Sequence, residues 1–145
     1  MKILLTRPLD DSYETILRFQ SLGHKVFHIP LISIESKNYE SINFSDFSGI
    51  IFTSANAIKF LNLKLIDKKI ICFCVGTATE KKAKAVGFQK IFCADGNVNN
   101  LKELILQNFN SSDGKLLYVS GEIISNELDQ QLIVKGYNVK RITNY

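Results

Sequence analysis

Small, hydroxyl-bearing turns follow the apolar runs of this sequence, and they hold the residues that could do chemistry. The clearest one comes after the apolar run Ile70–Cys74, where Gly76 is followed by Thr77 and Thr79. Glycine adopts backbone conformations closed to other residues, and a threonine hydroxyl accepts hydrogen bonds from free N–H groups at a helix start. A buried strand ending in such a turn brings those N–H groups and the positive end of a helix dipole together. The turn predicts an anion site; the simpler interpretation is that Thr77 or Thr79 only caps a helix.

Four other turns have the same character: Thr6-Arg7-Pro8, Thr53-Ser54-Ala55, Cys93-Ala94-Asp95-Gly96 and Ser120-Gly121-Glu122. Arg7 adds a fixed positive charge that can grip a carboxylate through two hydrogen bonds, with a solvated arginine as the equal alternative. Asp95 favours a capping or orienting role over catalysis. Together the turns favour a ligand with several negative charges held by backbone N–H groups. The candidate binding residues are Arg7, Thr53, Ser54, Ala55, Gly76, Thr77, Thr79, Ser120 and Gly121.

Several functional classes are not indicated. The sequence has no G-x-G-x-x-G and no G-x-x-x-x-G-K-[ST], so neither a dinucleotide nor a nucleoside triphosphate is expected. It has no Ser/His/Asp or Cys/His set. Its three cysteines lack C-x-x-C spacing, and His24 and His28 have no third ligand nearby. We therefore expect reduced, structural thiols and no metal site.

The charge and hydropathy of the chain indicate which classes of partner to expect. The net charge is +4, but the lysines are spread along the chain rather than clustered. Nucleic-acid and membrane arms are marked by basic runs, and a membrane span needs about 18 apolar residues. Neither is present in the sequence, so we expect a small anionic ligand and neither a nucleic acid nor a membrane as partner.

A regular alternation of strands and helices positions most of these turns. From Phe47 onward the patterns predict strands at Gly49–Phe52, Lys69–Cys74, Lys90–Phe92, Lys115–Val119 and Asn138–Thr143, separated by helices at Ser54–Leu63, Thr77–Val86, Asn97–Phe109 and about Ile124–Lys135. This order predicts an α/β fold, a flavodoxin-like doubly wound parallel sheet with helices on both faces. Ligands gather beyond the carboxyl ends of such strands, so we expect the turns on one rim, facing a cleft.

The first thirty residues predict a separate β-α-β unit. Strands at Lys2–Thr6 and Lys25–Ile29 flank a helix that Asp10 or Ser12 caps and that runs to about Leu22. Two strands and one helix do not bury an independent core. We therefore expect a partner chain, the main domain or further sequence to complete this unit, and its open edges favour self-association.

The order and spacing of six motifs resemble uroporphyrinogen-III synthase over the whole chain. The motifs are Leu4-Leu5-Thr6-Arg7-Pro8, Leu22-Gly23-His24 with Ile29-Pro30-Leu31, Phe52-Thr53-Ser54-Ala55-Asn56-Ala57, Val75-Gly76-Thr77-Ala78-Thr79, Ala94-Asp95-Gly96 and Ile142-Thr143-Asn144-Tyr145. The resemblance implies a cofactor-free, cytoplasmic lyase of tetrapyrrole (porphyrin and heme) biosynthesis. Such enzymes close linear hydroxymethylbilane into a ring and invert its last pyrrole through a spiro intermediate. The eight carboxylates of that substrate suit the predicted anion sites.

The resemblance also implies a domain organisation. The family has two flavodoxin-like domains joined by linker strands, the first domain being built from both chain ends. Residues 1–30 would be part of the first domain, 31–46 a linker strand (Leu31–Glu35) and polar linker, 47–138 the complete second domain and 139–145 the return linker strand. The C-terminal segment that completes the first domain in the family does not follow Tyr145 in this sequence. We therefore expect the 145-residue chain by itself to be inactive, or nearly so.

Three residues or turns take roles from the resemblance. Tyr145 matches the family's linker tyrosine, which is proposed to assist loss of the terminal hydroxyl, so it is the candidate catalytic residue. Thr79 matches a substrate-facing threonine, and the turn at Ser54 matches a substrate-contacting loop. The alternatives to a synthase are a non-catalytic module that binds a small anion and an assembly protein that pairs through the unit at residues 1–30.

Overall fold

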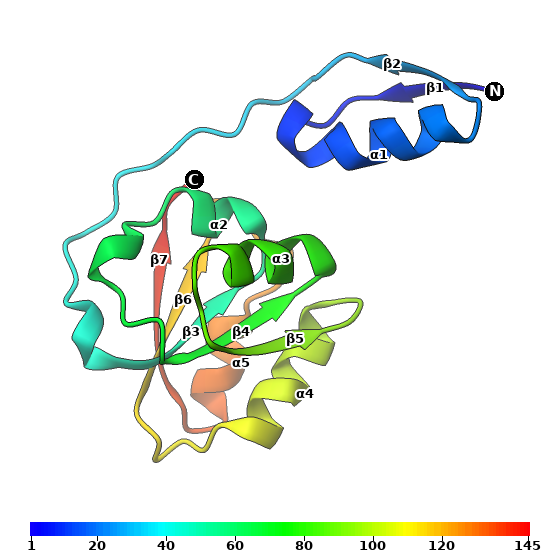
Figure 1. Cartoon of the computed structure of the whole chain (residues 1–145). Helices are drawn as coiled ribbons and strands as arrows, with labels where there is room; N and C mark the ends of the chain where they lie inside the picture. Colours follow the sequence, from blue (N-terminus) through cyan, green and yellow to red (C-terminus); the bar gives the residue numbers. More distant parts are fainter. The chain divides into compact units, whose positions relative to one another are not determined.

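The computed structural model describes residues 1–145 and divides into two compact units, Met1–Glu35 and Ser36–Tyr145 (Figure 1). The secondary structure confirms that the chain is an α/β protein with parallel sheets. No helix is both long and apolar enough to cross a membrane.

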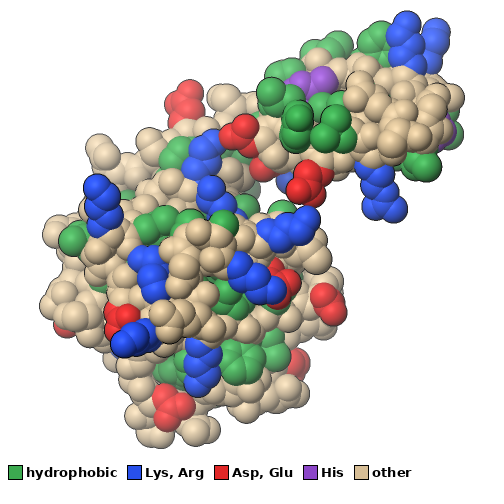
Figure 2. All heavy atoms as spheres, viewed as in Figure 1, with side chains coloured by type: hydrophobic (Ala, Val, Ile, Leu, Met, Phe, Trp, Pro, Cys, Tyr) green, Lys and Arg blue, Asp and Glu red, His purple; other side chains and the backbone are tan.

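The smaller unit is a β-α-β motif. It consists of β1 (Lys2–Leu5), α1 (Leu9–Ser21) and β2 (Lys25–His28), and the two strands pair in parallel from Lys2↔Lys25 to Leu5↔His28. Paired Leu4 and Phe27 share one face of this sheet and are exposed, and Ser12 is the one buried residue of the unit. Figure 2 shows hydrophobic side chains at the surface of this unit. The unit therefore has strands and a helix but no core of its own.

Helix α1 begins differently from the prediction. Its N-cap is Pro8, without a capping side chain, and Asp10 and Ser12 lie inside the helix. Pro8 has φ of −51° and ψ of 152°, a combination within the range open to proline, so its backbone alone sets the start of the helix without a side-chain acceptor. Ser12 instead donates its hydroxyl to the Arg7 carbonyl oxygen, at 3.3 Å.

The larger unit contains one parallel sheet of five strands in the order β5-β4-β3-β6-β7. The strands are β3 (Phe47–Phe52), β4 (Ile71–Val75), β5 (Lys90–Ala94), β6 (Lys115–Ser120) and β7 (Asn138–Thr143). The helices between them are α2 (Ala55–Lys59), α3 (Thr77–Ala85), α4 (Val98–Asn108) and α5 (Leu128–Val134). The predicted doubly wound parallel sheet, the architecture of flavodoxin-like folds, is confirmed.

The two faces of the sheet have separate cores, because successive strand residues point to opposite faces. Ile50, Cys72 and Leu117 pack with α2 and α3, through Ala57, Ile58 and Ala83. Ile51, Phe73 and Leu116 pack with α4 and α5, through Leu101, Ile105, Leu128 and Leu132. Helices on both faces leave the rims of the sheet as the places where a ligand can approach the strand ends.

Short elements differ most from the sequence prediction. Helix α2 has five residues rather than the predicted Ser54–Leu63. The 3-10 helix η2 (Leu63–Leu65) follows it after a short turn. Asn56, Ile58 and Asn62 are weak helix formers, which limits the length of α2. Helix α5 begins at Leu128 rather than near Ile124, since Ser125 and Asn126 favour turns over helix.

The linker is also different. Leu31–Glu35 forms no strand: the Leu31 N–H donates to the Thr6 carbonyl oxygen at 2.9 Å, but the pairing of β1 with β2 does not extend into this segment. A 3-10 helix, η1 (Phe44–Asp46), comes just before β3. β7 pairs with β6 along its whole length, so Asn138–Thr143 belongs to the sheet of the larger unit, which extends from Ser36 to Tyr145. The role of these segments in joining two family-type domains stays a prediction.

Candidate functional site

The strand order places a natural binding position between β3 and β6. From β3 the chain proceeds to β4 and β5 on one side, and β6 and β7 lie on the other. In doubly wound sheets the crevice beyond the carboxyl ends of the strands at such a switch point is where ligands bind. Because all five strands are parallel, the turns after Phe52, Val75, Ser120 and Thr143 lie on one rim.

The two hydroxyl groups of the turn after β3 have polar partners within the larger unit. Ser54 is the N-cap of α2, and its Oγ accepts a hydrogen bond from the Asn56 N–H at 3.2 Å. The Thr53 Oγ1 lies 3.4 Å from the Tyr118 hydroxyl, which approaches from β6. Burial raises the pKa of Tyr118, so this hydroxyl keeps its proton at neutral pH. Thr53, Ser54 and Ala55 are each half-buried at the rim.

The turn after β4 is built on Gly76 rather than on threonine. Gly76 is the N-cap of α3, with φ of 87°, and no side chain caps this helix. The simpler interpretation, that Thr77 or Thr79 caps α3, is therefore wrong: Thr77 is the first helical residue and Thr79 lies further in. Thr77 is exposed and Thr79 is buried, so of the two hydroxyl-bearing residues Thr77 is the more accessible.

The turn after β6 packs against the end of the chain. A Cβ added to Gly121 would lie 2.8 Å from Cε2 of Tyr145, so only glycine leaves room for that ring. Tyr145 also lies beside Phe60, with ring centroids 6.4 Å apart, and its carbonyl oxygen accepts from the Glu122 N–H at 2.8 Å. Ser120 is fully buried and donates its hydroxyl to the Gly121 carbonyl oxygen at 3.1 Å. The structure thus brings Tyr145 and Gly121 together with the end of α2.

Asn144 was missed by sequence reasoning. Its side chain is fully buried, and its Nδ2 donates to the carbonyl oxygen of Ala57 in α2 at 2.8 Å. Its backbone N–H donates to the Ser120 carbonyl oxygen at 3.1 Å, and its own carbonyl oxygen accepts from the Lys37 N–H at 2.8 Å. A single asparagine after a strand gives no sequence signal for partners so far along the chain.

A hollow of about 300 Å³ opens at the carboxyl end of β4. Its lining comes from the β4 end, the start of α4 and the loop before α5: Val75, Gly96, Asn97, Val98, Asn99, Ser125 and Asn126. The sequence predicted the turn at Asp95 and a capping or orienting role for that residue, but the cap of α4 is another residue. Asn97 caps α4, its Oδ1 accepting from the Asn99 and Asn100 N–H groups at 2.9 and 3.1 Å.

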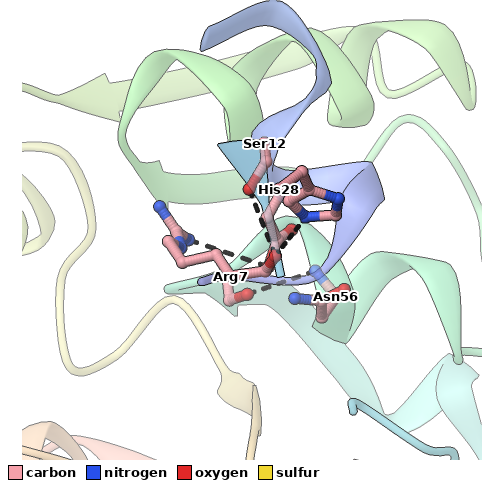
Figure 3. Close-up of polar contacts among 6 residues, drawn as sticks. Arg7, Ser12, His28 and Asn56 are labelled. Atoms are coloured by element: carbon pink, nitrogen blue, oxygen red, sulfur yellow. Dashed lines mark hydrogen bonds and ion pairs between the residues drawn. The ribbon is translucent and has the colours of Figure 1, made fainter. Parts of the chain in front are cut away.

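Arg7 belongs to the smaller unit. Its carbonyl oxygen accepts hydrogen bonds from Ser12 and from the His28 Nε2 at 2.8 Å (Figure 3). A carbonyl oxygen can only accept, so the His28 Nε2 carries a proton here. The Arg7 guanidinium is largely exposed and lies 3.7 Å from Asp11. Binding of a substrate carboxylate by Arg7 stays a prediction.

The three cysteines are free and lie in or at the sheet. Cys72 and Cys74 are buried, and Cys93 is half-buried. Burial raises the pKa of Cys72 to about 12 and also raises the pKa of Cys74 and of Cys93. The thiolate is the reactive form, so these thiols are poor nucleophiles at neutral pH. No group of three His, Cys, Asp or Glu side chains is close enough to hold a metal ion.

Comparison with known protein families gives a match to one family model, described as uroporphyrinogen-III synthase HemD, over residues 13–145. No curated protein sequence matches the chain. The matched region includes the whole of the larger unit, with the β3, β4 and β6 turns and Tyr145. The chain therefore belongs to the uroporphyrinogen-III synthase family, a family of lyases.

Proposed function

We propose that the protein is a uroporphyrinogen-III synthase, which closes hydroxymethylbilane into a ring with inversion of the last pyrrole. The family membership of residues 13–145 is the observation that supports this most strongly. The reaction belongs to tetrapyrrole biosynthesis, and its substrate is a linear tetrapyrrole with many carboxylates. We propose no cofactor for it.

The chemistry of the rim suits such a substrate. The N-terminus of α3 has no capping side chain, so its free N–H groups are available to a carboxylate. The proposed substrate-binding residue of the smaller unit is Arg7. The proposed substrate-binding residues of this rim are Thr53, Ser54, Ala55, Gly76, Thr77, Thr79, Ser120 and Gly121. The buried Ser120 and Thr79 would act through their backbone and packing.

The proposed mechanism relies on positioning. Hydroxymethylbilane closes spontaneously to the un-inverted ring, so the enzyme must hold the last pyrrole against an easier path. Tyr145 is the proposed hydrogen-bond donor to the departing hydroxyl. The raised pKa of Tyr118 keeps a second rim hydroxyl protonated beside Thr53. Conformational control of the substrate and fixed dipoles of the protein would supply most of the rate enhancement.

The test is the isomer ratio of the product. Freshly made hydroxymethylbilane is added to the gene product that contains these 145 residues, and the porphyrins are separated after oxidation. We expect type III isomer well above the protein-free baseline. We expect the 145-residue chain by itself to give mostly the un-inverted isomer, because residues 1–35 bury one side chain and have no core of their own. A gene product that binds the tetrapyrrole but leaves the isomer ratio at baseline would favour the anion-binding module instead.

A further inference from the structure

We propose that Asn144 is a positioning residue of this site: its buried amide fixes α2 against the ends of β6 and β7 and thereby sets the place of the Tyr145 ring. The kinetic part of this inference rests on the proposed function. The structural part stands on the hydrogen bonds alone.

Asn144 is the point where four segments of the larger unit meet. Through Nδ2 it bonds to Ala57 in α2, through its N–H to Ser120 in β6, and through its carbonyl oxygen to Lys37. Figure 1 shows the end of β7 beside α2, as these bonds require. The next residue in the chain is Tyr145, so any shift of Asn144 moves the candidate catalytic ring.

Helix α2 needs an external tie of this kind. Five residues make little more than one turn, and helices this short are not stable by themselves, because the first turn is costly to nucleate. Ser54 holds the start of α2 through its cap, and Asn144 holds its middle through Ala57. The two residues before α2, Thr53 and Ser54, are proposed to contact the substrate. The amide thus couples that turn to Tyr145.

Packing alone does not explain an asparagine here. The Asn144 Oδ1 is buried and has no hydrogen-bond partner, and an unpaired buried polar atom costs free energy. An apolar side chain would avoid that cost but would give up the Nδ2 bond to Ala57. We infer that the geometry fixed by this bond is the reason for the amide.

The test compares two variants with a matched control. Asn144→Ala removes the amide, and Asn144→Leu removes it while filling the space. Tyr137→Phe removes another side-chain bond to a backbone oxygen, the 2.6 Å bond to Phe109, which joins residues flanking the opposite end of the sheet. All are measured at a temperature where urea unfolding shows them fully folded.

Hydrogen exchange tests the structural part in any folded chain. We expect the amides of Glu122 and Phe60, which bond to Tyr145 and Asn56, to exchange about 10-fold faster in both Asn144 variants, as expected for loss of one buried hydrogen bond. In Tyr137→Phe they should exchange as in the parent. Parent-like exchange of both amides in both Asn144 variants would overturn the proposal.

Kinetics test the positioning role in the gene product. We expect kcat to fall about 10-fold with little change in KM, since a misplaced group lowers transition-state stabilisation, and the un-inverted fraction of product to rise. A folded variant with the parent's kcat and isomer ratio would overturn the positioning role. If the parent itself makes no type III isomer, the proposed function fails, while the exchange result still decides whether Asn144 fixes α2 and Tyr145.

Discussion

The Tyr145 hydroxyl is the single group whose removal tests the proposed chemistry most directly. Its ring is fixed by Gly121 and Phe60, contacts that a phenylalanine would keep. Tyr145→Phe should therefore leave stability almost unchanged while lowering kcat roughly 10- to 100-fold, which corresponds to about 1–3 kcal/mol for a hydrogen bond made in the transition state. Single-turnover assays and urea unfolding measure the two effects. A parent-like rate would remove Tyr145 from the mechanism.

A second residue-scale effect concerns Cys72, whose pKa burial raises from 9.0 to about 12. Between these values the unfolded thiol loses its proton while the folded one keeps it, so folding stability falls as pH rises. At lower pH both states hold the proton and the effect vanishes. The slope is at most about 1.4 kcal/mol per pH unit. Between pH 8 and pH 10.5 the free energy of unfolding of Cys72→Ala, measured in urea, should therefore fall less than that of the parent. Parallel losses in the two proteins would contradict the buried-thiol explanation.

At the scale of elements, the turn after β6 and the chain end act as one packed unit. Gly121→Ala places a methyl group within 3.0 Å of Cε2 and Cζ of Tyr145, so the ring or the turn must move. We expect a loss of about 1–3 kcal/mol in the free energy of unfolding. In a Tyr145→Ala background the same change should cost almost nothing, because the clashing ring is gone. A double-mutant cycle by urea unfolding measures this coupling. Additive effects on the free energy of unfolding would show that the Tyr145 ring is not the reason for a glycine at position 121.

The sequence was sufficient to predict elements that rest on their own pattern. Strand β7 begins and ends as predicted, because the β-branched Val139, Ile142 and Thr143 and the Gly136 before them are local signals. Caps and short helices were harder. The caps are Pro8, Gly76 and Asn97, where the sequence offered Asp10 or Ser12, Thr77 or Thr79, and a capping or orienting role for Asp95. Pro8 and Gly76 cap without a side-chain acceptor, so a search for hydroxyl and carboxylate side chains does not find them. The length of α2 depends on tertiary contacts that local propensity does not contain.

At the scale of the whole molecule, the sequence could predict the rim but not how its residues contact one another. Parallel strands with hydroxyl-bearing turns at their ends imply a common rim whatever the strand order. The contact of Tyr145 with Gly121 and the bond of Asn144 to Ala57 depend on the order β3-β6-β7, which no local pattern encodes. These long-range contacts give the site its proposed geometry, and only the structure supplies them.

The two units should differ in local stability. The central strands β3, β4 and β6 are buried on both faces, with Ile51, Phe73 and Leu117 nearly inaccessible. In the smaller unit Leu4 and Phe27 are exposed, and one residue of the 35 is buried. Protection of an amide follows the free energy of the opening that exposes it, and that free energy is low where few apolar contacts are lost. We therefore expect slow hydrogen exchange in Ile70–Cys74 and Lys115–Val119 and fast exchange before Pro30.

The comparison has an internal control, because both units contain parallel strand pairs with regular backbone bonds. β1 and β2 pair over four positions, as β3 and β4 do, so hydrogen bonding alone predicts equal protection. The burial argument predicts a difference of several orders of magnitude in exchange rate between Ile3, whose N–H lies on the β2 side of β1, and Ile51. Mass spectrometry of peptides from the 145-residue chain, at a concentration where it is monomeric, measures both. Equal protection in the monomer would mean that residues 1–35 have a stabilising contact that their own burial does not account for.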